Sequence, residues 1–132
     1  MTSIMVTGSR VWPNTRILYT VLTEFLISHT TEDDGLITLI NGGAQGVDTL
    51  VQEYWRSNDI GNVITVYPDW ARHGRRAGIV LNIDMINLDP TYVLAFIYNG
   101  SKGATFTYEE SLRRGLDTYA FIIDSNIKQE VQ

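Results

Sequence analysis

Residues 36–51 read LITLINGGAQGVDTLV, a short apolar run that passes through a glycine-rich turn into a segment with apolar residues at helical spacing. A strand, a turn and a helix in this order are typical of one βα unit of a parallel sheet. The pattern recurs along the chain, and five strands are predicted, over residues 3–7, 36–41, 62–67, 92–98 and 118–123. Most of them are continuously apolar, which indicates a sheet that helices cover on both faces.

Four helices are predicted between and beside these strands. The first is capped by Asn14 and runs to about Leu26, and the second follows Gly46 and ends near Asn58. The third covers about residues 75–88, and the fourth covers about residues 105–114 and ends at Gly115. The sequence therefore predicts an α/β fold, a single Rossmann-like domain with a parallel sheet of about five strands and helices on both faces.

The predicted third helix is unusual because little of its circumference is polar. We expect it to be buried on more than one side. Two arrangements explain the pattern equally well: a deeply buried central helix, or a helix that a second subunit covers in a homodimer or a larger homo-oligomer.

The length and composition set limits on the class of protein. A chain of 132 residues suits one core, and we predict one domain over residues 1–124 with a polar tail over residues 125–132. Cysteine is absent and His29 lies far from His73, so no metal site is expected. The net charge of −5 disfavours nucleic acid as a partner. The sequence shows neither a signal peptide nor an apolar run of membrane-spanning length, so we expect a cytoplasmic protein with no membrane partner.

The unusual residues of this chain follow the carboxyl ends of the predicted strands, where parallel α/β sheets bind ligands. Residues 41–46 and 99–103 are glycine-rich loops that each open a helix, so their backbone N–H groups are placed to bind an anion. Neither loop matches G-x-G-x-x-G or the Walker pattern, so a dinucleotide dehydrogenase or a P-loop NTPase is not supported and no cofactor is predicted.

A basic group strengthens the prediction of an anion site. One strand–glycine–helix junction is equally consistent with a tight turn that binds nothing. Two such loops favour a ligand when Ser9, Arg10, Lys102 and the cluster over residues 72–76 meet at the same edge. A small basic patch of this kind suits a small anion better than a long polymer.

Two carboxylates and four aromatic residues are further candidates. Asp48 either offsets the dipole of its helix or accepts hydrogen bonds from a ribose hydroxyl. Glu109, one of two adjacent acids on the last helix, is either a solvated residue or a general acid or base. We expect one or two of the aromatic side chains to contact a ligand and the others to be packing residues; the four are Trp12, Tyr67, Trp70 and Tyr98.

Four motifs together resemble a known family. They are TGSR at residues 7–10, NGGAQGVD at residues 41–48, DW-x-x-HG-x-x-AG at residues 69–78 and GSKGA at residues 100–104. Over nearly the whole chain, residues 4–123, the sequence is similar to the SLOG superfamily, which includes Smf/DprA proteins and Lonely Guy phosphoribohydrolases. It is most similar to the small stand-alone branch related to YpsA and YspA.

The resemblance implies a site for a nucleotide or a nucleotide-derived signal. With the loop residues, it gives this set of predicted ligand-binding residues: Gly8, Ser9, Arg10, Gly42, Gly43, Gln45, Gly46, Asp48, Trp70, Arg75, Arg76, Asn82, Gly100, Ser101, Lys102 and Gly103.

The chain departs from the enzymes of the superfamily at one decisive position. Lonely Guy enzymes carry P-G-G-x-G-T-x-x-E, whose glutamate assists cleavage of the N-glycosidic bond, and Thr107 stands in its place here. Asn99, Ser101 and Ala104 replace three further residues of the signature. The branch also commonly has an Arg-Asn pair where this chain has Leu81 and Asn82.

Three functions follow, in this order. The first is binding without turnover, in which the protein senses or sequesters a nucleotide-derived molecule, as superfamily members are thought to do in bacterial and phage conflict. The second is a phosphoribohydrolase acting on a nucleoside monophosphate, with Asp48 or Glu109 as the catalytic carboxylate. The third, single-stranded DNA binding as in Smf/DprA, conflicts with the acidic charge.

Overall fold

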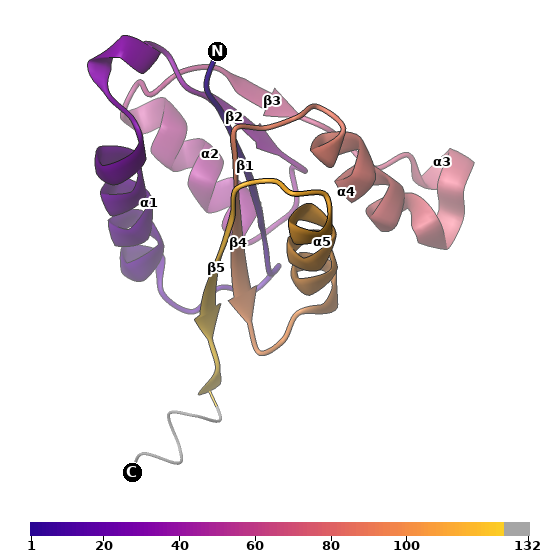
Figure 1. The fold of residues 1–132 in the computed structure, drawn as a ribbon. Coiled ribbons are helices and arrows are strands. Elements are labelled where there is room, and N and C mark those ends of the chain that lie inside the picture. The colour runs from indigo at the N-terminus through magenta and orange to yellow at the C-terminus, as the bar shows by residue number, and fades with distance from the viewer. Residues whose placement is uncertain (126–132) are drawn as a thin grey trace.

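Five parallel strands form one sheet in the computed structural model, which describes residues 1–125 (Figure 1). The strands lie in the order β3-β2-β1-β4-β5, which confirms the predicted α/β fold with a parallel sheet. Their bounds are β1 Ser3–Gly8, β2 Thr38–Asn41, β3 Val63–Thr65, β4 Tyr92–Tyr98 and β5 Thr118–Ile123. The predicted polar tail lies outside the described residues except for Ser125.

The helices and short helical turns connect these strands. The helices are α1 Thr15–His29, α2 Val47–Ser57, α3 Trp70–His73, α4 Ala77–Ile86 and α5 Lys102–Arg113, and the turns are η1 Glu32–Asp34 and η2 Gly74–Arg76. No helix among residues 1–125 combines the length and the apolar character that a bilayer crossing needs.

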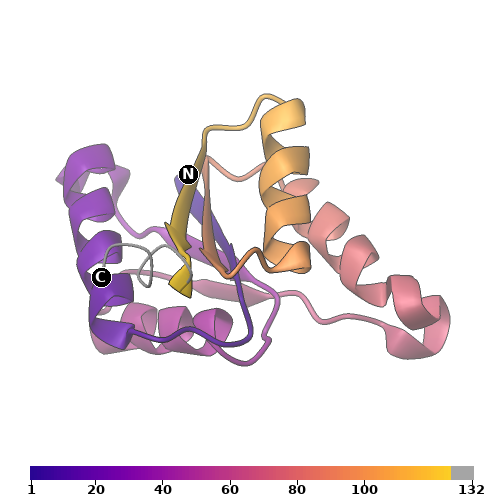
Figure 2. The ribbon, with the colours of Figure 1, turned by 90° about the horizontal axis from the view of Figure 1, so that it is seen from below.

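Alternating side chains of the central strands pack against different helices. Ile4 and Val6 of β1 join Leu22 of α1 and Trp55 of α2 in the larger core cluster. Met5 of β1 faces the other way, into the cluster that contains residues 85 and 86 of α4. Figures 1 and 2 agree that α1 and α2 cover one face of the sheet and that α4 and α5 lie on the other. The predicted helices on both faces are therefore confirmed.

The segment before α4 differs from the prediction. Instead of one helix from about residue 75, the chain forms α3, then η2, and only then α4. Asp69 caps α3, because its side chain accepts a hydrogen bond from the Arg72 N–H at 3.0 Å. Gly74 follows with φ +54°, a left-handed conformation that interrupts the helix. Figure 2 shows α3 at the outer end of the molecule, beyond α4.

Of the two arrangements expected for the third helix, deep burial within one chain is not found, and cover by a second subunit stays a prediction. Only Ala77, Met85 and Ile86 of α4 are buried, and the side chain of Ile79 is 43% exposed. Leu88, just after the helix, is 49% exposed. The reason is that α4 packs on the central strands mainly through its C-terminal end, where Met85 and Ile86 join Met5 and Val93, and has α5 beside it, so Ile79 near its start is left exposed.

Two strands are shorter than predicted. β2 begins at Thr38 rather than at residue 36, and the side chain of Leu36 is exposed. β3 spans Val63–Thr65 rather than residues 62–67, since it is an edge strand that pairs with β2 through three register positions only. A strand predicted from a run of apolar residues extends past the hydrogen-bonded part of the strand when apolar loop residues follow or precede it.

Candidate functional site

The order of strands places an open pocket at the carboxyl ends of β1 and β4. The chain moves from β1 outward to β2 and β3, then returns to the other side of β1 with β4, so the topological switch point lies between β1 and β4. A pocket of about 700 Å³, here called the switch-point pocket, opens there. Its lining residues are Thr7, Gly8, Ser9, Arg10, Val11, Ala44, Asp48, Trp70, Arg75, Gly78, Ile79, Leu81, Asn82, Met85, Tyr98, Ser101, Lys102, Gly103, Ala104 and Phe106.

Three cationic side chains from three parts of the chain line this pocket. Arg10 comes from the loop after β1, Arg75 from η2 and Lys102 from the first position of α5. Among residues 1–125, the ion pairs present join Glu110 to Arg113 and Arg114, so none of the three pocket cations is neutralised by an acidic partner at ion-pair distance. The pocket therefore carries positive charge in an otherwise acidic protein.

The N-terminus of α5 adds backbone donors to the same pocket. Asn99 and Gly100 both have positive φ, and the Ser101 N–H donates to the Tyr98 carbonyl at 3.2 Å, which makes the tight turn for which Asn-Gly is the preferred sequence. Ser101 then starts the helix without a side-chain cap. The first N–H groups of a helix have no intrahelical acceptor, so this end of α5 is suited to an anion.

The other glycine loop uses its N–H groups within the protein. The Gly43 N–H donates to Asn41 Oδ1 at 2.8 Å, and the Ala44 N–H donates to Asp48 Oδ2 at 3.1 Å. Asn41 is itself fixed by Gln52, whose Nε2 donates to the same oxygen at 2.6 Å. Residues 43 and 44 thus form the wall beside the pocket, and their donors are already occupied in this conformation.

The hydroxyl of Ser9 is also occupied. It accepts a hydrogen bond from the Tyr98 N–H at 2.8 Å and donates to the Phe96 carbonyl at 3.5 Å, which ties the end of β1 to β4. The side chain is buried at the base of the pocket. Ser9 therefore holds together the carboxyl ends of the two strands at which the pocket opens.

Asp48 is the one carboxylate among the lining residues. Its side chain is buried, its Oδ2 accepts from the Ala44 N–H, and its Oδ1 has no hydrogen-bond partner among the described residues. Burial raises the pKa of Asp48 to about 6, against the opposing effect of hydrogen bonds from the Ala44 and Gly42 backbone. A carboxyl group with this pKa can exchange a proton close to neutral pH.

One side of the pocket is apolar. Ile79, Leu81 and Met85 of α4 face it, together with Phe106 of α5, while Tyr98 ends β4 beneath it. Trp70 of α3 stands at its margin with 53% of its side chain exposed. A pocket that combines cationic with apolar and aromatic groups suits a ligand that joins an anionic group to a ring.

The structure brings most of the predicted ligand-binding residues together. Gly8, Ser9, Arg10, Asp48, Trp70, Arg75, Asn82, Ser101, Lys102 and Gly103 line the switch-point pocket. The predicted residues outside the lining are Gly42, Gly43, Gln45, Gly46, Arg76 and Gly100. Gly46 has a structural role next to the pocket, since an added Cβ would lie 2.2 Å from the Arg10 carbonyl oxygen.

The apolar lining residues were missed at the sequence level. The sequence pattern assigns four of them only to helices: Ile79, Leu81, Met85 and Phe106. For the three residues of α4, the signal that they also line the pocket is the apolar character of that helix. Of the four aromatic candidates, Trp70 and Tyr98 line the pocket. Trp12 instead packs edge-on against Phe96 at 5.6 Å between ring centroids.

The second candidate carboxylate lies elsewhere. Glu109 is exposed on α5 and does not line the switch-point pocket. Thr107, at the position of the Lonely Guy glutamate, is fully buried and donates its hydroxyl to the Gly103 carbonyl at 3.0 Å. Among the described residues, no three histidine, aspartate or glutamate side chains gather as a metal site would require.

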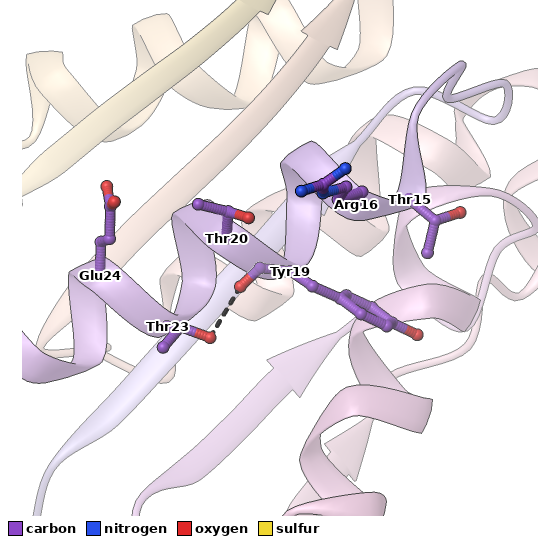
Figure 3. A pocket seen from close by; sticks show the side chains of 6 residues that line it. All are labelled: Thr15, Arg16, Tyr19, Thr20, Thr23 and Glu24. Carbon is purple, nitrogen blue, oxygen red and sulfur yellow. Dashed lines mark hydrogen bonds between the residues drawn. The ribbon is translucent and has the colours of Figure 1, made fainter.

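A second hollow, of about 660 Å³, lies on the outer surface of α1 (Figure 3). Its lining residues all belong to that helix: Thr15, Arg16, Tyr19, Thr20, Thr23 and Glu24. The Thr23 hydroxyl donates to the Tyr19 carbonyl at 2.8 Å, so part of its polar surface is already engaged. None of the predicted site residues lies there, and the switch-point pocket is the better candidate.

The fold and the pocket define an α/β protein whose site lies at the topological switch point of a parallel sheet. Residues 2–73 match the family described as "YspA, cpYpsA-related SLOG family". The chain is also 30% identical over 125 residues to the "Gene 61 protein" of Mycobacterium phage D29, covering 92% of this chain and 97% of that protein. No solved structure matches the chain. The chain therefore belongs to the YspA, cpYpsA-related SLOG family, which confirms the resemblance seen in its motifs.

Proposed function

We propose that this protein binds a phosphate-bearing nucleotide derivative in the switch-point pocket and holds it without turnover. The observation that carries the proposal is the meeting of Arg10, Arg75 and Lys102 with the uncapped start of α5 around one pocket. The volume, about 700 Å³, is in the range of small-molecule sites. Membership of the SLOG family supports a nucleotide-related ligand.

In the proposed complex, the phosphate lies at the start of α5, where Lys102 and the helix dipole both favour negative charge. The base or another ring lies against the apolar side formed by Leu81 and Phe106. The buried hydroxyl of Thr107 cannot replace a catalytic glutamate, because it is already bonded to the Gly103 carbonyl. This supports binding over hydrolysis.

We further propose that binding serves to sense or to sequester a nucleotide signal in conflict between phage and bacterium. The mycobacteriophage relative, which matches 97% of its length, supports the phage setting. The exposed apolar surface of α4 supports a homodimer or larger homo-oligomer as the working form.

Native mass spectrometry tests the proposed binding directly. The purified protein is incubated with a pool of nucleotides, cyclic dinucleotides and ADP-ribose derivatives, and the pool is then separated by chromatography. We expect one bound mass, recovered chemically intact. A Lys102→Ala variant should lose it, while Arg56→Ala, on the outer part of α2, should keep it. Retention of every pool member in the unbound fraction would refute the proposal.

A second function, hydrolysis of the N-glycosidic bond of a nucleoside monophosphate, is favoured by one observation. Asp48 is a buried carboxyl in the pocket wall whose pKa is raised to about 6, which is suitable for a general acid or base. Release of free base from a panel of monophosphates, above the level of an Asp48→Asn variant, would establish this activity. Equal release by both proteins would exclude it.

A further inference from the structure

The carboxylate of Asp48 lies in the wall of a pocket that is otherwise cationic. The three charged neighbours that line the pocket are Arg10 after β1, Arg75 of η2 and Lys102 of α5, while α4 contributes only uncharged lining residues. His73 of α3, partly buried two residues before Arg75, is a further titratable group in that segment and does not line the pocket. Asp48 is therefore the one acidic lining residue that an entering anion meets.

The surroundings of Asp48 stabilise its negative charge only in part. Oδ2 has the Ala44 N–H as a donor, but Oδ1 is enclosed and has no partner among the described residues. Leu81 adds an apolar neighbour, since its Cδ2 and Asp48 Oδ2 lie 3.1 and 3.4 Å from the position of a Cβ built on Gly42. No cation lies at ion-pair distance from Asp48 within residues 1–125.

An anion in this pocket acts on Asp48 through space. Two negative charges in a partly desolvated site repel each other much more strongly than they do in water. The repulsion is removed when the carboxyl group takes up a proton, and the enclosed Oδ1 then carries no charge. Because burial, against the opposing backbone hydrogen bonds, already brings the pKa of Asp48 to about 6, the additional free energy needed for protonation near neutral pH is small.

We propose, building on the function proposed above, that Asp48 takes up a proton when an anion fills the switch-point pocket, so that phosphate-bearing ligands bind more weakly as the pH rises. The sign follows from linkage. A complex in which Asp48 has a higher pKa than in the free protein is stabilised fully below the free-state pKa of about 6. That stabilisation is lost as the pH rises through the pKa of the complex.

Isothermal titration calorimetry between pH 5 and 8 tests this linkage. The probes are sulfate and ADP-ribose, because neither changes its charge across this range, unlike a phosphate monoester. Each titration is repeated in two buffers with different heats of ionisation, which gives the number of protons taken up on binding. We expect proton uptake around pH 6 to 7, and binding about tenfold weaker at pH 8 than at pH 5, which corresponds to a one-unit rise in the pKa of Asp48.

Two variants test whether Asp48 is the side chain that takes up the proton. Asp48→Asn keeps an oxygen for the Ala44 N–H and places an uncharged NH₂ group where Oδ1 lies, so it imitates the protonated side chain. Its affinity should be independent of pH and should equal at pH 8 the affinity of the natural protein at pH 5. His73→Gln removes the imidazole two residues before Arg75 and should leave the proton uptake unchanged.

The outcomes separate the two proposals. Binding of either probe with no proton uptake, or uptake that persists in Asp48→Asn, overturns the proton linkage and leaves the proposed function intact. Affinity that rises with pH also overturns it, and would show instead that the ionised carboxylate accepts a hydrogen bond from the ligand. If neither probe binds at any pH and native mass spectrometry finds no ligand in the pool, both proposals are refuted.

Discussion

Gly46 shows why one residue of the first glycine loop has no substitute. Its φ is +79°, and a Cβ at this position would lie 2.2 Å from the carbonyl oxygen of Arg10 and 2.6 Å from that of Ser9. The absence of a side chain therefore lets the loop after β1 pack directly on the start of α2. The glycine acts on the pocket by setting the position of its wall, although it does not line the pocket itself.

We expect Gly46→Ala to destabilise the protein by more than its backbone conformation alone explains. Gly115 has nearly the same φ, +78°, with no atom within 4 Å of an added Cβ, so Gly115→Ala gives the cost of a positive φ without a clash, about 1 kcal/mol. Gly46→Ala adds overpacking of roughly 1–3 kcal/mol. Urea unfolding of both variants gives the two free energies. Equal losses would show that the loop moves aside without strain.

Asp48 should make the stability of the protein depend on pH. Its folded-state pKa of about 6 lies above the ordinary value of 3.8, so its ionisation opposes folding. The stability present below pH 4 is lost as the pH rises through about 6. This pKa rise corresponds to about 3 kcal/mol in all, of which about 2 kcal/mol is lost between pH 4 and 7.5. The free energy of unfolding of Asp48→Asn, relative to that of the natural protein, should therefore rise by that amount between pH 4 and 7.5. Parallel stability curves for the two proteins would contradict this.

At the scale of elements, the start of α5 is left without a cap. Ser101 provides no side-chain hydrogen bond to the first turn, although serine is a common capping residue. A carboxylate at this position would satisfy those N–H groups permanently and would occupy the place proposed for the ligand phosphate. The uncapped start of this helix lowers its stability and leaves the first N–H groups free for the proposed ligand.

We expect Ser101→Asp to raise stability by about 0.5–1 kcal/mol and to weaken sulfate and ADP-ribose binding severalfold. Thr20→Asp, on the exposed surface of α1, adds the same charge far from α5 and should leave binding unchanged. Thermal unfolding and calorimetry measure both effects. Stabilisation without weaker binding would place the anion away from the start of α5.

The elements differ in how well the sequence predicts them. β1 and β4 were placed almost to the residue, because strands buried on both faces have no polar interruptions. α3 is not predicted because a helix of four residues has too few turns to show a period. Its one signal in the sequence is the capping residue Asp69. The closure of the first glycine loop on Asn41 and Asp48 was also missed, since sequence does not reveal which acceptor an N–H will find.

At the scale of the whole molecule, the proposed assembly rests on the apolar surface at α4. Ile79 of α4 is 43% exposed, and Leu88, just after the helix, is 49% exposed. The candidate site was predictable as a group of loops because parallel strands bring their carboxyl ends to one edge. Its apolar side was not, because the packing angle of α4 against the sheet depends on contacts among the folded elements.

We expect the natural protein to sediment as a dimer or larger species and Ile79→Glu to sediment as a smaller one. A charge in the centre of an apolar interface costs too much free energy for association to persist. Ile27→Glu, at a 74% exposed position on α1, introduces the same charge on the opposite face and should keep the assembly. A monomer mass for the natural protein in analytical ultracentrifugation would refute the assembly.

The central place of β1 has a consequence for synthesis on the ribosome. β1 is made well before β4, yet its ladder with β4 joins Ile4 to Tyr92 and Gly8 to Phe96. Such a pairing requires the closure of a very long loop, which slows folding. Until residue 98 has left the exit tunnel, the nascent chain lacks one of the two strands that create the pocket. Every translation product that stops earlier is therefore devoid of the complete pocket.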